Sequence, residues 1–176
     1  MKYLYLLRHA KSSWENPNIP DHDRPLARRG ERAGAAIATV VAALSPRPDL
    51  VLCSTATRAQ ETLALVRHAL GDTPVRLEPV LYTLEAVHLR QHLERLDDAA
   101  TAVLVIGHNP SLEVLAQDLA AADSGPAMTR LRRKFPTATL ADLDLPIATW
   151  AALGETLARG DAHLRRFTRP ADLRSP

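Results

Sequence analysis

The chain has 176 residues, of which 46% are hydrophobic and 24% are charged, a composition typical of one soluble globular domain. The formal net charge is +2, and no long basic stretch is interleaved with aromatic residues, so neither nucleic acid nor a membrane is an expected partner. The apolar stretch near the N-terminus is too short for a signal peptide or a membrane span. The single cysteine, Cys53, excludes a disulfide within the chain and is expected to be a small buried hydrophobe. We therefore expect a protein of the cytoplasm.

Short apolar runs alternate along the chain with longer segments of helical period. The runs predict strands at residues 3–7, 50–53, 75–78 and 102–106, followed by a more polar pair at 139–144 and 162–166. Apolar residues three or four positions apart predict helices at 30–44, 57–70, 89–96 and 112–119. The Pro- and Arg-rich segment 124–136 is typical of a loop.

This order of elements predicts an α/β fold. We expect a three-layer α/β/α sandwich around a mostly parallel sheet, with an antiparallel edge strand among the last two. Residues 1–169 are expected to form a single domain, because no repeat, linker or low-complexity segment interrupts them. Residues 170–176 are expected to form a short C-terminal tail that has little to bury.

Polar side chains follow three of the predicted strands at the points where those strands end. Arg8 and His9 follow the first strand, and the second strand leads into a helix that begins close to Arg58. The fourth strand ends at His108, just before a helix for which Asn109 is the expected N-cap. Because ligands bind outside the carboxyl ends of strands in open α/β sheets, Arg8, His9, Arg58 and His108 are expected to line one site.

The four side chains suit the transfer of a phosphoryl group. The guanidiniums of Arg8 and Arg58 offer forked donors that match phosphate oxygens and stay charged at any working pH. Of the two imidazoles, one can act as a neutral nucleophile and the other as a protonated donor to an equatorial oxygen. The pattern therefore indicates transfer through a covalent phosphohistidine, without a metal or another cofactor. The sequence has no Gly-rich phosphate loop, HExxH motif or Cys pair.

Each of these residues also has a purely structural interpretation. Arg8 could be a surface arginine at a strand end, His108 a helix-capping histidine and Arg58 an exposed residue of a first helical turn. The position of Arg58 favours an anion, however, because a cation alone is unfavourable near a helix N-terminus. The sequence DHDRP at residues 21–25 is typical of a polar loop rather than a metal site.

Four motifs in the order LLRHAKSSW, RPLARRG, LCSTATRAQET and VLVIGHNPSLE resemble the histidine phosphatase superfamily, which has the phosphoglycerate-mutase-like fold. More narrowly, they resemble its small SixA-type phosphohistidine phosphatases. The later segments KFPTATLADLDL and GDAHLRRFTRPADL are similar to the same group, so the resemblance covers essentially the whole chain. The resemblance implies a phosphatase of signal transduction.

The resemblance also implies a role for each matching position. His9 would be the phosphorylated nucleophile, and Arg8, Arg58 and His108 would hold the transferring phosphoryl group. Arg24 matches a position that borders the site, where it would either contact substrate or stabilise its loop through a salt bridge.

Two positions bear on how closely the chain follows the family. Ala10 replaces the usual glycine of an RHG motif, so the loop after His9 is expected to follow a different path. Many members place a carboxylic acid after the third strand, where it protonates an alcohol leaving group. Glu85 is the nearest candidate here, but it could equally be the first-turn acid of the next helix.

The lack of a clear general acid favours a phosphohistidine substrate over a sugar phosphate. An alkoxide needs a proton in order to leave, whereas an imidazole bonded to phosphorus can already hold a proton on its other nitrogen. The chain also has no long insertion that could cover the site, which suits a side chain displayed on another protein. We therefore expect a monomeric phosphatase of histidine-phosphorylated proteins. The alternatives are a phosphatase of small phosphate esters and a module that binds phosphate or a phosphoprotein without turnover.

Overall fold

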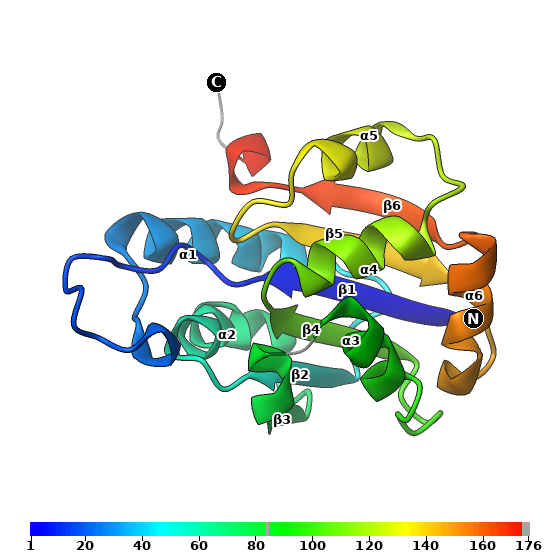
Figure 1. The fold of residues 1–176 in the computed structure, drawn as a ribbon, viewed down its shortest axis with the longest axis horizontal. Coiled ribbons are helices and arrows are strands. Elements are labelled where there is room, and N and C mark those ends of the chain that lie inside the picture. Colours follow the sequence, from blue (N-terminus) through cyan, green and yellow to red (C-terminus); the bar gives the residue numbers. More distant parts are fainter. Residues whose placement is uncertain (84, 174–176) are drawn as a thin grey trace.

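The computed structural model describes residues 1–83 and 85–173. Its strands form one sheet of six in the order β3-β2-β4-β1-β5-β6 (Figure 1). The strands are β1 (Lys2–Arg8), β2 (Leu50–Ser54), β3 (Val75–Glu78), β4 (Ala102–Gly107), β5 (Leu140–Leu145) and β6 (His163–Thr168). Strands β1 to β4 are mutually parallel, whereas β5 is antiparallel to both β1 and β6. The strand that reverses direction is thus β5, and β6 lies outside it at the edge of the sheet.

Helices cover both faces of this sheet, which confirms the three-layer α/β fold (Figure 1). One face packs against α1 (Arg28–Ala42) and α2 (Thr57–Leu70), and the other against α3 (Ala86–Leu93), α4 (Ser111–Leu119), α5 (Pro126–Arg133) and α6 (Leu153–Arg159). Side chains alternate along β1, so Tyr5 and Leu7 join the first core and Leu4 and Leu6 the second. Among the described residues, no helix is both long and apolar enough to cross a membrane.

Helix α5 lies within the segment 124–136, which the sequence predicted to be a loop. Pro126 stands in its first turn, where a missing N–H costs no hydrogen bond. Ala127, Met128 and Leu131 are buried against the core. The loop prediction was wrong because the arginines between these positions hide a short apolar face of helical period.

Asn109 is not the N-cap of α4, because Pro110 holds the cap position and no side chain caps the helix. The Asn109 side chain instead donates to Oε2 of Glu113 at 2.9 Å and to the carbonyl oxygen of Phe135 at 3.1 Å. The N-cap prediction was therefore wrong. Asn109 ties the start of α4 to the segment that follows α5.

The residues after Arg169 include a short 3-10 helix, η4 (Pro170–Leu173), which lies beside α1. Leu173 is partly buried against the core on the α1 and α2 face. None of the η4 residues is fully buried, and residues 174–176 of the predicted tail lie outside the described residues. Arg169, just before η4, lines a groove together with Arg8 at the carboxyl end of β1.

Candidate active site

The carboxyl ends of β1, β2 and β4 bring the predicted side chains to one place. Arg8 pairs with Gly107 in the parallel ladder, and the N–H of His9 donates to the Gly107 carbonyl at 3.0 Å. This register sets His9 beside His108, with 4.9 Å between the ring centroids. Together with Arg58 from the first turn of α2, these side chains line an open pocket of about 260 Å³, which we call the active-site pocket.

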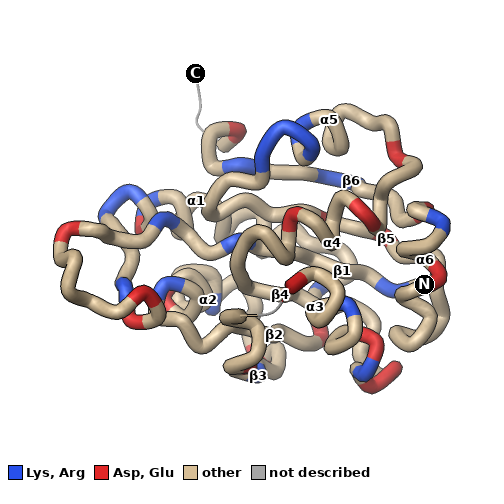
Figure 2. Tube along the Cα trace, in the orientation of Figure 1, with Lys and Arg blue, Asp and Glu red and all other residues tan. Residues whose placement is uncertain are grey.

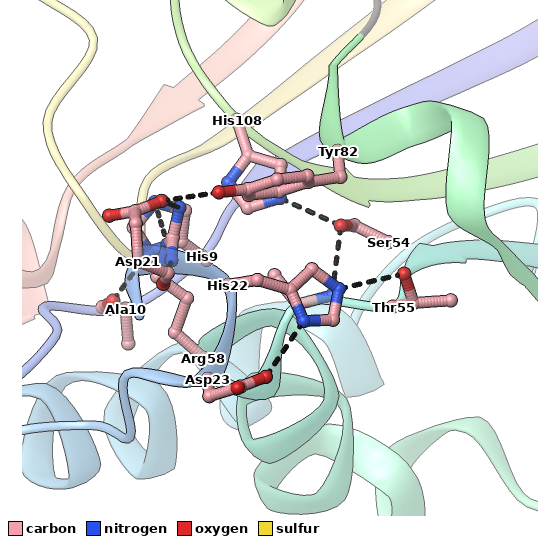
Figure 3. Close-up of polar contacts among 11 residues, drawn as sticks. His9, Ala10, Asp21, His22, Asp23, Ser54, Thr55, Arg58, Tyr82 and His108 are labelled. Carbon is pink, nitrogen blue, oxygen red and sulfur yellow. Dashed lines mark hydrogen bonds and ion pairs between the residues drawn. The ribbon is translucent and has the colours of Figure 1, made fainter. Parts of the chain in front are cut away.

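Two contacts fix the tautomer of His9 (Figure 3). Its Nδ1 lies 2.7 Å from the carbonyl oxygen of Ala10, and its Nε2 lies 3.3 Å from Nε of Arg58. A carbonyl oxygen only accepts and a guanidinium only donates, so Nδ1 holds the proton and Nε2 presents its lone pair. Burial, together with Arg58 and Arg8, lowers the pKa of His9 to about 4. His9 is therefore a neutral, oriented imidazole at neutral pH, which is the state that a histidine nucleophile requires.

Ala10 supports this arrangement without the usual glycine. The Ala10 residue is fully buried, and its N–H donates to Oγ1 of Thr62 at 2.9 Å. The Thr62 hydroxyl in turn donates to the carbonyl oxygen of Arg58 at 2.6 Å. Among the described residues other than glycine, only Ala138 has a positive φ, so the backbone at Ala10 does not require glycine.

His108 is neutral when no anion is bound. Burial, together with His9 and Arg58, lowers the pKa of His108 to about 3. Its Nε2 lies 2.8 Å from Oγ of Ser54, whereas its buried Nδ1 has no hydrogen-bond partner among the described residues. A phosphoryl group in the pocket would add negative charge and favour the protonated imidazole, which is the state that the sequence predicted.

Arg8 is held at the rim of the pocket by the chain that follows α5. One of its terminal nitrogens donates to the carbonyl oxygen of Phe135 at 2.7 Å. The N–H of Phe135 donates to Oε1 of Glu113 at 3.2 Å, so the acceptor is itself fixed. The Nε of Arg8 is buried and lacks a partner among the described residues, which leaves a charged donor available for an oxyanion.

Asp21 also lines the active-site pocket, although the sequence indicated only a polar loop there. Its Oδ2 accepts from Nη2 of Arg58 at 3.0 Å and from the Tyr82 hydroxyl at 2.7 Å (Figure 3). Its backbone carbonyl accepts from Nη1 of Arg58 at 2.6 Å. The Tyr82 hydrogen bond and the Arg58 charge lower the pKa of Asp21, so this carboxyl is ionised at neutral pH. Asp21 thus occupies Arg58 donors that suit a phosphoryl group.

Asp21 and Tyr82 lie in segments whose sequence carries little indication of a site. Asp21 belongs to a 3-10 turn, η1 (Asp21–Asp23), and Tyr82 ends another, η2 (Pro79–Tyr82). Neither turn has the periodic pattern that places a side chain on a known face. The only available sign for Asp21 was its position three residues before Arg24 in the motif DHDRPL.

Two predicted residues do not join the cluster. Arg24 is buried, with its guanidinium 3.9 Å from the centroid of the Trp14 ring, and it donates to the carbonyls of Asn16 and Pro17 at 3.2 and 3.3 Å. It binds the loop through carbonyl oxygens and has no carboxylate within 4.0 Å among residues 1–83 and 85–173, and it contacts the exposed Trp14, which lines the pocket. Glu85 is exposed just before α3 and is not among the described residues that line the pocket.

The composition of the pocket favours an oxyanion over a metal ion. Within residues 1–83 and 85–173, no three His, Cys, Asp or Glu side chains form a group that could hold a metal. Cys53 is buried in β2, and burial raises the pKa of its thiol to about 12. Nε of Arg8, which is buried and has no partner among the described residues, is a charged donor that matches an oxygen of a phosphoryl group. The unpaired Nδ1 of His108 would be a second donor in the protonated imidazole.

Comparison with known proteins agrees with this chemistry. Residues 4–84 match the sequence model of the histidine phosphatase superfamily (branch 1). The chain is 41% identical over 139 residues to the uncharacterized protein Rv1276c of Mycobacterium tuberculosis, covering 78% of this chain and 85% of that protein. The structure of a candidate phosphohistidine phosphatase SixA from Nakamurella multipartitia has a TM-score of 0.80 and 31% identity, with 96% of each chain covered. A second candidate SixA, from Agrobacterium tumefaciens, has a TM-score of 0.79 and 27% identity, with 96% of this chain and 98% of that one covered. The chain therefore belongs to the histidine phosphatase superfamily, in its SixA-type group, and is a phosphatase.

Proposed function

We propose that this protein is a phosphohistidine phosphatase that removes the phosphoryl group from a histidine of another protein. The observation that carries this proposal is the neutral, oriented imidazole of His9, with Nδ1–H on the Ala10 carbonyl and the Nε2 lone pair beside Arg58. The names of the similar structures from Nakamurella multipartitia and Agrobacterium tumefaciens support the same substrate class. The enzyme would act as a monomer in the cytoplasm, on proteins of phosphotransfer signalling.

In the first step, the lone pair on Nε2 of His9 attacks phosphorus in line with the bond to the substrate nitrogen. A new N–P bond forms on His9, and the electron pair of the old N–P bond returns to the substrate imidazole. Arg8, Arg58 and a protonated His108 would stabilise the charge on the equatorial oxygens. The carboxylate of Asp21 must give up its contact with Arg58 for these oxygens to bind.

In the second step, water attacks the phosphorus bound to His9. The N–P bond breaks, its electron pair returns to Nε2, and the proton that the water loses stays with the released phosphate. His9 leaves as a neutral imidazole, because Nδ1 keeps its proton on the Ala10 carbonyl throughout. The contact with Ala10 thus supports both halves of the reaction without a separate acid at His9.

The carboxyl groups near the pocket favour an N–P substrate over an ester. Asp21 has a lowered pKa and is ionised at neutral pH, so it holds no proton for an alkoxide. Glu85, the acid suggested by the sequence, is exposed and does not line the pocket. An imidazole leaving group that is protonated on its other nitrogen departs neutral and needs neither residue.

Phosphate release without metal ions tests the proposal. The substrates would be a phosphotransfer protein phosphorylated on histidine and p-nitrophenyl phosphate, with a chelator present throughout. We expect much faster release from the phosphoprotein, complete loss in His9→Ala, and wild-type rates in His88→Ala, which replaces an exposed histidine of α3. Faster turnover of the ester would indicate a small-molecule phosphatase. No turnover of either substrate would indicate a module that only binds phosphate.

A further inference from the structure

A second, larger groove adjoins the active-site pocket. It has a volume of about 530 Å³ and shares Arg8, Lys11 and Thr137 with that pocket. Five cationic side chains line it: Arg8, Lys11, Arg29, Lys134 and Arg169. We call it the basic groove. A ligand that places its phosphoryl group beside His9 can therefore extend directly into the basic groove.

The positive charge of the basic groove is poorly compensated within the molecule. None of the described residues that line the groove is acidic. Arg169 pairs with Asp172 at 2.7 Å, but Lys11, Arg29 and Lys134 have no carboxylate within 4.0 Å among the described residues. Like charges that converge without counter-ions raise the local potential and attract anions. Since Arg29 and Lys134 are exposed, their charges are available to a partner.

Segments that are far apart in the sequence build this charge. Arg29 lies in the first turn of α1, a position where a cation gains nothing from the helix dipole. Lys134 directly follows the basic last turn of α5, and Arg169 follows β6. Figure 2 shows the basic end of α5 close to the chain that follows β6. The groove thus exists only because α5 and the chain after Arg169 fold back beside β1 and α1.

The groove fits a polypeptide better than a second small anion. It is open and about twice the volume of the active-site pocket, whereas sites for small molecules enclose most of their ligand. Pro136, Pro170 and Ala33 lie among the cations, so its lining also offers apolar surface. Acidic side chains on an extended segment can reach separate cations while the rest of that segment covers this apolar surface.

We propose that the basic groove binds an acidic segment that lies beside the phosphohistidine on the substrate protein, and that it selects which phosphoproteins are dephosphorylated. This inference rests on the proposed function, because it names a feature of the same substrate. Arg8 and Lys11 line both cavities, so they join the two binding regions. Arg29 and Lys134 lie outside the active-site pocket and recognise only the acidic segment.

Charge reversal at these two residues tests the proposal. The variant Arg29→Glu/Lys134→Glu would be compared with wild type on two phosphohistidine peptides, one flanked by Asp and Glu and one by Asn and Gln. We expect kcat/KM for the acidic peptide to fall at least about tenfold, mainly through KM, while the neutral peptide changes less than about twofold. The control Arg76→Glu/Arg95→Glu makes the same charge change at two exposed arginines that line neither cavity, with Arg76 on β3 at the far edge of the sheet and Arg95 just after α3. It should leave both peptides unaffected.

Several results would overturn the proposal. Equal losses on both peptides, equal losses in the control variant, or no loss at all would each show that the groove does not select acidic segments. Strong competition by inorganic pyrophosphate that depends on Arg29 and Lys134, without discrimination between the peptides, would assign the groove to a small polyphosphate.

A binding measurement separates this proposal from the proposed function. If wild type hydrolyses p-nitrophenyl phosphate but neither phosphohistidine peptide, the proposed function fails. Calorimetric titration with the unphosphorylated acidic peptide then tests the groove by itself. Binding to wild type that is lost in Arg29→Glu/Lys134→Glu supports the groove, and absence of binding to wild type contradicts it.

Discussion

The side chains of Arg58 and His9 are in contact before any substrate is bound, with Nε of the arginine 3.3 Å from Nε2 of the histidine. The two other nitrogens of the same guanidinium bind the backbone and side chain of Asp21. One cation therefore contacts the His9 imidazole and also holds a carboxylate beside it. After burial, which is the largest cause, the Arg58 charge helps to lower the pKa of His9, whereas the Asp21 carboxylate opposes this shift. An incoming phosphoryl group would compete with Asp21 for Arg58.

Asp21→Asn is expected to strengthen the binding of inorganic phosphate or orthovanadate by roughly three- to tenfold. The substitution removes a negative charge that repels the anion and holds the Arg58 guanidinium. Inhibition constants measured at pH 7 check this. The matched control is Asp23→Asn, because Asp23 bonds His22 at 3.0 Å rather than Arg58. Unchanged or weaker inhibition in Asp21→Asn would show that the carboxylate does not compete with phosphate.

The pH dependence of kcat/KM should report the low pKa of His9. Because this pKa is about 4, Nε2 keeps its lone pair well below the range in which an ordinary histidine protonates. We expect kcat/KM to stay level from neutral pH to about 5 and to fall near pH 4 as His9 binds a proton. A stopped-flow assay with brief acid exposure measures this limb. A fall centred on the ordinary histidine value of 6.5 would contradict the buried, neutral state of His9.

The two buried imidazoles should also make the fold sensitive to acid. Their pKa values are lowered in the folded protein, so the unfolded chain takes up protons first as the pH falls. The contribution of the two neutral imidazoles to the free energy of unfolding is therefore fully present above pH 6.5. It is lost progressively as the pH falls from 6.5 to the pKa values of the folded protein, about 4 and 3. One pKa unit corresponds to about 1.4 kcal/mol, so the free energy of unfolding should fall by several kcal/mol. Urea titrations at pH 7.5 and 4.5 measure this loss. In the variant His9→Gln/His108→Gln, the loss of unfolding free energy between these two pH values should be clearly smaller than in wild type. An equal loss would show that titratable groups other than these two histidines cause the acid sensitivity.

Gly30→Ala is expected to lower the free energy of unfolding by about 2–4 kcal/mol. A Cβ at this position would collide with the backbone carbonyl oxygen of Lys11, which accepts the N–H of Ala27 at 2.8 Å where the chain enters α1. Because the nearest atoms all belong to the Lys11 backbone, the collision cannot be relieved by rotating a side chain. In the control Gly107→Ala, the atoms nearest to the new Cβ would be those of the Leu112 side chain, at an ordinary contact distance of 3.7 Å. Thermal unfolding compares the two, and equal stabilities would show that the loop at Lys11 moves freely.

The proximity of four pocket residues could be predicted from the sequence because their positions follow from the topology of the sheet. Once β1, β2 and β4 are parallel, the residues just after them must meet at one edge of the sheet, as Arg8, His9 and His108 do. Arg58 follows because α2 begins directly after β2. The partner of His9 could not be predicted, since it depends on the direction of a single carbonyl, that of Ala10.

The features that could not be predicted from the sequence lie in segments without a clear periodic pattern of apolar residues. Asp21 reaches Arg58 only through the path of the loop between β1 and α1, and nothing in its residue type fixes that path. The arginines of α5 interrupt its apolar positions, so the sequence did not predict this helix. Lys134, directly after α5, lines the basic groove. Residue type and position after β3 indicate Glu85 as an acid, but in the structure its side chain is exposed. The regular elements of this fold are therefore more predictable than its turns.

The most direct test of the account is to find where the phosphoryl group resides during turnover. The enzyme would be mixed with phosphoramidate, quenched in alkali, and analysed by phosphorus NMR and by peptide mapping. We predict an acid-labile phosphoryl group on Nε2 of His9, because Nδ1 is bound to the Ala10 carbonyl, and no such group in His9→Ala. A phosphoryl group on Nδ1 of His9 or on His108, or turnover without any phosphorylated histidine, would contradict the account.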